Sequence, residues 1–162
     1  MNSTTEHLSK YLTLQDAIKA RPGFSNKPSE DQIKALIYWG TCVLDPIVEH
    51  FGVVPFLHSV FRNDAYNAAI GGDPHSQHRF GQAGDMDFDN VPKAPNNKAL
   101  FDFVVRNLNF DQIIWEKGTN ENPDWVHVSA IDGVNRKKIT QCVVVEGKTC
   151  YKPFDLYKFP TQ

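Results

Sequence analysis

The chain has 162 residues, a hydrophobic fraction of 41%, a charged fraction of 22% and a formal net charge of −2. That length suits one domain with a sizeable core, so we treat residues 1–162 as a single domain. The charge balance gives no electrostatic case for binding nucleic acid or an anionic membrane. No apolar run approaches the roughly 20 residues that span a bilayer.

The two ends of the chain are predicted to differ. Residues 1–7 lack the basic start and apolar segment of a secretory signal, so we expect synthesis in the cytoplasm and release by other factors. Residues 1–12 are expected to form a flexible start. Residues 141–162 are expected to form a C-terminal hairpin, turning at Gly147-Lys148, and an aromatic tail.

Helix signals dominate the first third of the chain. Thr13 can cap a short helix. Ser29 and Gln32 have the spacing of a capping box, which predicts a longer helix ending at Gly52. The apolar residues of this helix recur at helical spacing, and Pro46 is expected to kink or break it.

The remaining segments read as strands, loops and one more helix. The predicted strands cover residues 53–61, 85–89, 110–116 and 125–130, and the last two are expected to pair as a hairpin. Residues 67–74 are expected to be a turn-rich loop, and Asn97 to cap a helix. Within 85–89 the alternation puts Asp85 on one face and Met86 towards the core. The pattern predicts an α+β fold: a small, mainly antiparallel sheet flanked by helices.

The three cysteines are expected to be reduced. In the predicted C-terminal hairpin, Cys142 and Cys150 lie three positions out of register, which is too far to bridge. Cys42 is expected to lie in the core of the long helix, since a free cysteine is usually a buried hydrophobe.

One motif concentrates metal-binding residue types. Residues 76–85 read Ser-x-His-x-x-Gly-x-Ala-x-Asp, and a second histidine follows on a predicted strand. We interpret His78, Asp85 and His127 as the ligands of one catalytic Zn²⁺, because such sites use three protein ligands and keep one position for water. From spacing alone, ordinary structural roles for the three residues are an equal alternative.

Two other kinds of site do not fit. Residues 85–96 begin like a calcium-binding loop, but Asn90 stands where glycine is required and Asn96 where glutamate is required. None of the cysteines has a local signature of a catalytic nucleophile.

A zinc hydrolase also needs a general base and a positive partner for developing negative charge. Glu116 ends the strand before His127, and pairing with Trp125 would put it on the same face as the histidine. Asp124, three residues before His127, is the alternative base. Arg62, after the strand-like segment 53–61, is the candidate cation.

These residues resemble the zinc D-alanyl-D-alanine carboxypeptidase family, which shares its fold with the hedgehog signalling domain and certain phage endolysins. The similar segments occur in the family's order, at residues 44–47, 59–62, 67–72, 76–85, 110–116 and 125–129. The sequence departs from the family at Val60, where glycine is usual. Other branches of the family carry a glutamate at the position of Asp124, so the resemblance leaves the choice of base open.

The resemblance implies a function and several residue roles. It implies His78, Asp85 and His127 as the ligands of one zinc per chain, Arg62 as the residue that polarises the substrate, and Ser76 as a support residue near the site. The implied reaction is hydrolysis of peptidoglycan stem peptides, either as a D,D-carboxypeptidase or as an endolysin-type endopeptidase encoded by a phage. We expect a monomer. The alternative function is a non-catalytic, zinc-containing binding or virion structural module of the same fold.

Overall fold

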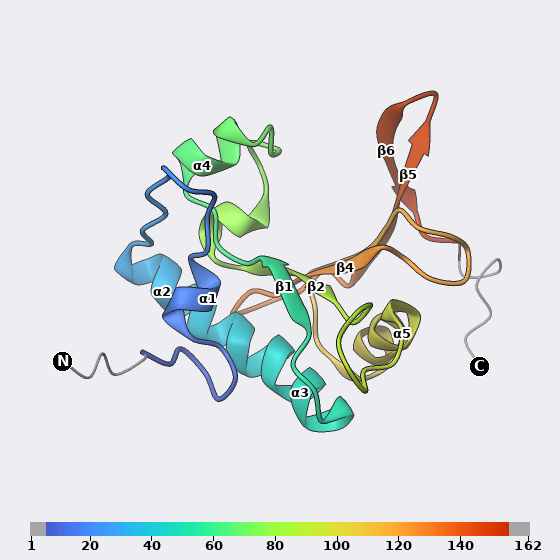
Figure 1. Ribbon diagram of the computed structural model, residues 1–162, viewed down its shortest axis with the longest axis horizontal. Helices are drawn as coiled ribbons and strands as arrows, with labels where there is room; N and C mark the ends of the chain where they lie inside the picture. The colour runs from blue at the N-terminus through green and yellow to red at the C-terminus, as the bar shows by residue number, and fades with distance from the viewer. Residues whose placement is uncertain (1–5, 156–162) are drawn as a thin grey trace.

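The computed structural model describes residues 6–155, so the first five residues of the predicted start and most of the predicted aromatic tail lie outside the described residues. The α+β prediction is confirmed: one six-stranded sheet, in the order β1-β2-β4-β3-β5-β6, is flanked by helices (Figure 1). Neighbouring strands are antiparallel except for β3 and β5, which are parallel. The strands are β1 (Phe56–Ser59), β2 (Ala83–Asp87), β3 (Gln112–Glu116), β4 (Trp125–Ser129), β5 (Lys138–Val145) and β6 (Lys148–Pro153).

The helical elements are short. They are α1 (Leu14–Ala17), α2 (Glu30–Trp39), the π-helical turn η1 (Gly40–Leu44), α3 (Asp45–Phe51), α4 (Asp64–Ala69), the 3₁₀ helix η2 (Gln77–Phe80) and α5 (Asn97–Asn107). The predicted caps of the first two helices are confirmed at Thr13 and at the Ser29–Gln32 capping box. In the described part of the chain, no helix has the length and apolar character needed to cross a bilayer.

Pro46 does not break the predicted long helix. Instead, η1 inserts a wider turn just before it, and the Asp45 N–H donates to the Gly40 carbonyl five residues back. Proline cannot donate a backbone hydrogen bond, and a wider turn accommodates that loss without ending the helical path. The helix ends as predicted at Gly52, which has a φ of 72°.

The predicted flexible start is wrong for residues 6–12. Leu8 and Leu12 are buried in the core. The carboxylate of Asp45 accepts a hydrogen bond from the Ser9 hydroxyl at 2.8 Å and one from the Tyr11 backbone N–H at 3.1 Å. The start of α3 therefore fastens this segment to the domain.

Two smaller predictions also need correction. The expected loop over 67–74 begins inside α4, which Asn63 caps. Asn96, rather than Asn97, caps α5. Asn97 is buried, and its side chain accepts a hydrogen bond from the Phe88 N–H at 2.7 Å. The second error arises because neighbouring asparagines are equally good caps, and tertiary contacts decide which one is used.

The C-terminal hairpin turns one residue earlier than predicted. Its turn residues, Glu146 and Gly147, have φ values of 49° and 76°, the pattern of a type I′ turn. Cys142 consequently pairs with Tyr151, and Cys150 with Val143. The prediction of three free thiols is confirmed, but Cys42 is only half-buried.

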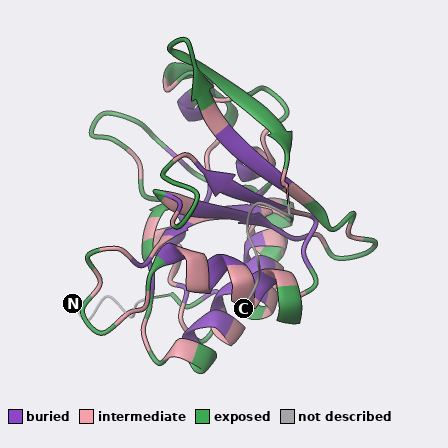
Figure 2. Ribbon diagram, turned by 90° about the vertical axis from the view of Figure 1, so that its right-hand side faces the viewer, coloured by how far each residue is buried: buried purple, intermediate pink, exposed green. Residues whose placement is uncertain are grey.

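The core lies between one face of the sheet and the helices α2, α3 and α5, where buried residues concentrate (Figure 2). As predicted, Met86 points into this core and is fully buried. Trp39 packs directly on β2, where a Cβ at Gly84 would lie 2.2 Å from the indole Cζ2. The Trp39 Nε1–H also donates to the Val128 carbonyl at 2.9 Å. This contact holds α2 against the two strands that carry Asp85 and His127.

Candidate metal centre

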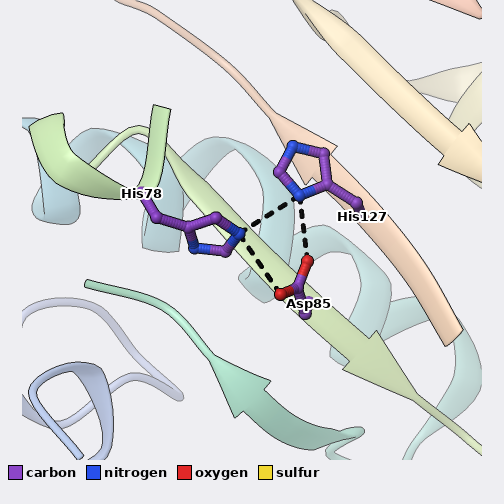
Figure 3. Close-up of side chains that lie close together, drawn as sticks. All are labelled: His78, Asp85 and His127. Carbon is purple, nitrogen blue, oxygen red and sulfur yellow. Dashed lines mark hydrogen bonds and ion pairs between the residues drawn. The ribbon is translucent and has the colours of Figure 1, made fainter. Parts of the chain in front are cut away.

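Three elements bring His78, Asp85 and His127 together on the face of the sheet away from the core. His78 comes from η2, while Asp85 and His127 lie directly opposite each other on β2 and β4. Figure 3 shows the three side chains pointing at one another. His127 Nδ1 lies 2.9 Å from Asp85 Oδ1 and 3.2 Å from His78 Nε2, and His78 Nε2 lies 3.3 Å from Asp85 Oδ2.

A backbone carbonyl fixes the orientation of His78. The ring nitrogen Nδ1 lies 2.7 Å from the Val60 carbonyl oxygen, and the side chain is buried. Because a carbonyl can only accept, Nδ1 carries the hydrogen, and the lone pair is left on Nε2. Nε2 is the nitrogen that faces Asp85 and His127. Such hydrogen bonds commonly orient metal-binding histidines.

The donor set and its spacing fit a metal ion. Two imidazoles and one carboxylate form a common catalytic zinc set, with bonds of about 2.0–2.2 Å. Tetrahedral ligands at that distance lie about 3.3 Å apart. The observed separations of 2.9, 3.2 and 3.3 Å are close to this value. The three side chains can therefore hold one metal ion.

The electrostatics of the centre also favour metal binding. Burial lowers the pKa of His78. Burial alone would raise the pKa of Asp85, but the facing imidazoles of His78 and His127 hold it well below its usual range. At neutral pH, His78 is therefore neutral and Asp85 is ionised, which are the forms that bind metals.

A cleft of about 590 Å³ lies over this centre. One wall is the segment after α4, from Gly71 to Ser76, and the other includes Thr149 and Tyr151 of β6. Arg62, Glu116 and the three candidate ligands also line it. The structure thus brings every predicted site residue except Asp124 to one cleft.

Arg62 has hydrogen-bonding capacity to spare. Its Nη2 donates to the Ser76 hydroxyl at 3.3 Å. Its Nε is buried and, within the described part of the chain, has no hydrogen-bond partner. Burial lowers the pKa of Arg62, which nevertheless stays charged at neutral pH. The charged guanidinium also lines the cleft, where it is suited to bind an oxygen of a substrate.

The two candidate bases lie in different surroundings. Glu116 pairs with Trp125 across β3 and β4, so it shares a face with His127 and lies diagonal to it, as predicted. It is buried, and burial raises its pKa. Asp124 is exposed and does not line the cleft. Its backbone N–H donates to the Glu116 carbonyl at 2.9 Å. Geometry therefore favours Glu116.

Sequence reasoning missed two parts of this region. Nothing in the sequence around Tyr151 indicates that it belongs to the site, because its position depends on the pairing of β5 with β3. The other part is a polar bridge at the rim of the cleft, where buried Asp111 accepts hydrogen bonds from Gln77 at 3.0 Å and from the Arg136 Nε at 3.0 Å. Gln77 and Arg136 also line a neighbouring cavity of about 680 Å³.

Asp111→Asn should make stability respond differently to pH. The hydrogen bonds from Arg136 lower the pKa of Asp111 in the folded chain. Its stabilisation is therefore full above the unfolded pKa of about 3.9 and is lost as pH falls through the folded pKa. We expect Asp111→Asn to lower the free energy of unfolding by about 2 kcal/mol at pH 7. The difference should shrink below about pH 4.

Urea denaturation between pH 2.5 and pH 7 measures this effect. The exposed Asp132 on the neighbouring loop provides the control, and Asp132→Asn should change little at any pH. A difference between Asp111→Asn and the original chain that stayed constant over this range would contradict the argument.

Comparison with known protein families gives one match. A family model described as Peptidase M15 matches residues 10–129, which covers most of the chain and all three candidate ligands. A search of curated proteins finds no match. The matched range ends at Ser129, before β5 and β6.

Proposed function

Because the chain belongs to the Peptidase M15 family, that of the zinc D-alanyl-D-alanine carboxypeptidases, we propose that it is a zinc peptidase acting on the stem peptides of bacterial peptidoglycan. The observation that carries the proposal is the His78, Asp85 and His127 cluster at the floor of a cleft that also holds Arg62 and Glu116. If the cluster only stabilised the fold, it would not require the charged groups of Arg62 and Glu116 beside it.

The three ligands define what the metal would contribute. His78 Nε2, His127 Nδ1 and an oxygen of Asp85 would hold the ion. A bound Zn²⁺ lowers the pKa of a coordinated water and polarises a carbonyl. The Val60 carbonyl keeps the lone pair of His78 directed at the ion.

Glu116 supplies the acid–base chemistry in this proposal. Its carboxylate takes a proton from the attacking water and passes it to the leaving amine. A base works best when its pKa is near the working pH, and burial moves the pKa of Glu116 in that direction. Its place diagonal to His127 on the same face puts the carboxylate beside the metal position.

Arg62 and Ser76 bind the substrate oxygen. The Arg62 guanidinium, which lines the cleft, holds the developing oxyanion or a terminal carboxylate. Ser76 holds the guanidinium in place through its hydroxyl. Binding a substrate oxygen would offset the cost of burying the charged Arg62 guanidinium.

Metal content and peptide hydrolysis test the proposal together. We expect the purified chain to hold one zinc and to release amino groups from purified peptidoglycan. A chelator should stop the release, and added zinc should restore it. Mass spectrometry of the products separates loss of a terminal D-alanine from a cut within the stem peptide. Bound zinc without any release would favour a non-catalytic binding module, and absence of zinc would overturn the proposal.

A further inference from the structure

One wall of the cleft comes from the hairpin β5–β6, which lies outside the range matched by the family model. Figure 1 shows this hairpin at the far end of the sheet from α4 and the loop that follows it, with both standing above the sheet in that view. Thr149 and Tyr151 of β6 line the cleft from that side. The hairpin is therefore part of the site as well as an extension of the sheet.

Strand pairing brings Tyr151 into line with Glu116. The parallel pairing of β3 with β5 sets Glu116 beside Cys142, and the antiparallel pairing of β5 with β6 sets Cys142 beside Tyr151. Paired residues project from the same face of a sheet. Tyr151 thus lies on the face that carries the metal centre, two strands beyond Glu116.

Tyr151 is placed to contact a ligand. It is a large aromatic residue with 59% of its surface exposed, yet it lies in a cleft. It shares that cleft with Arg62 and Asp85. Partial burial and the Glu116 carboxylate raise the pKa of Tyr151, so the phenol is protonated and can donate a hydrogen bond at neutral pH.

An extended peptide in this cleft would meet donors on both sides. Successive carbonyls of an extended chain point in opposite directions. The Arg62 guanidinium lines the cleft beside the metal centre, and the Tyr151 hydroxyl offers a donor from the hairpin side. A peptide held over the metal centre could use both at once.

We propose that Tyr151 is a substrate-positioning residue, whose hydroxyl donates a hydrogen bond to a carbonyl or carboxylate oxygen of the bound peptide, opposite Arg62. This inference rests on the proposed function and deepens it, because it makes the hairpin a determinant of which peptides bind.

Tyr151→Phe tests the inference by removing only the hydroxyl. We expect KM for a synthetic stem pentapeptide ending in D-alanyl-D-alanine to rise about five- to tenfold, with kcat within about twofold. Lys152→Met is the matched control, because Lys152 is the next residue of β6 and does not line the cleft. It should leave both constants within about twofold. Thermal unfolding of each variant checks that the hairpin stays folded.

The other outcomes overturn the inference. An unchanged KM for Tyr151→Phe would remove the hydroxyl from substrate binding, and a fall in kcat alone would make Tyr151 a catalytic residue instead. If the original chain showed no turnover, the proposed function would fail separately. Calorimetric titration of the zinc-loaded chain with the same pentapeptide would then decide the inference, because Tyr151→Phe should weaken binding by the same factor.

Discussion

Glu116→Gln should nearly abolish peptide hydrolysis while leaving the metal in place. The amide of glutamine has almost the shape of the carboxyl group but cannot accept the proton of the attacking water. General acid–base catalysis contributes about 10²- to 10⁴-fold, so we expect kcat to fall by about 10³-fold or more. Zinc content should stay at one per chain, because Glu116 is not among the three side chains that meet at the metal centre.

Asp124→Asn provides the comparison that identifies the base. It makes the same change of charge at the exposed acid that does not line the cleft, and we expect kcat to stay within about twofold. Steady-state kinetics on the pentapeptide and elemental analysis of each variant measure both properties. Loss of activity in Asp124→Asn with activity kept in Glu116→Gln would reverse the assignment. Full activity in both variants would exclude a carboxylate base at either position.

Loss of activity in Glu116→Gln should not result from unfolding of the variant. Glu116 is buried, and burial raises its pKa because the charged form is poorly solvated there. The neutral amide avoids that cost, so Glu116→Gln should unfold at a temperature equal to or above that of the original chain. A large drop in unfolding temperature would show that the carboxylate has a structural task as well.

Part of the centre was predictable because its geometry is local. Six residues lie between His78 and Asp85, and Gly81, with a φ of 71°, makes the turn between them. The Gln112–Glu116 and Trp125–Ser129 strands are close in sequence, so a hairpin prediction sufficed to put Glu116 and His127 on one face. Strand periodicity then decided which side chains face the core and which face the site.

The missed features depend on contacts between distant segments. The parallel pairing of β3 with β5 cannot be read from either strand alone, and it determines that Tyr151 reaches the site. A shift of one residue in the hairpin register moves a side chain to the other face of a sheet. The sequence Val-Glu-Gly-Lys does not by itself show that Glu146, a residue that rarely adopts positive φ, takes the first turn position.

Tertiary contacts also explain the errors in the helices and the start. A proline after helical sequence predicts a break in the helix. Only the structure shows that η1 accommodates Pro46. The first residues looked polar and unanchored, although Leu8 and Leu12 are buried and Asp45 binds the backbone between them. At the start of the chain, a partner more than 30 residues away overrides the local pattern. At Pro46, a rare helical turn does so.

His127→Ala should remove the metal and reduce hydrolysis to background. The substitution takes away Nδ1, which lies 2.9 Å from Asp85 and 3.2 Å from His78, and two protein ligands do not make a stable catalytic zinc site. Zinc that binds the folded chain also stabilises it against unfolding. We therefore expect added zinc to raise the unfolding temperature of the original chain but not that of His127→Ala.

His58→Ala is the matched control for this prediction. His58 also lies beside a carboxylate, with its Nε2 3.0 Å from Asp87 Oδ2 on the neighbouring strand, but it is outside the metal-binding group. It should keep one zinc, the zinc-dependent rise in unfolding temperature and hydrolysis within about twofold. If His127→Ala retained zinc and activity while His58→Ala lost them, the catalytic metal would lie at the β1 edge of the sheet. The close fit of His78, Asp85 and His127 would then reflect an ordinary buried ion-pair network, the structural role that spacing alone could not exclude.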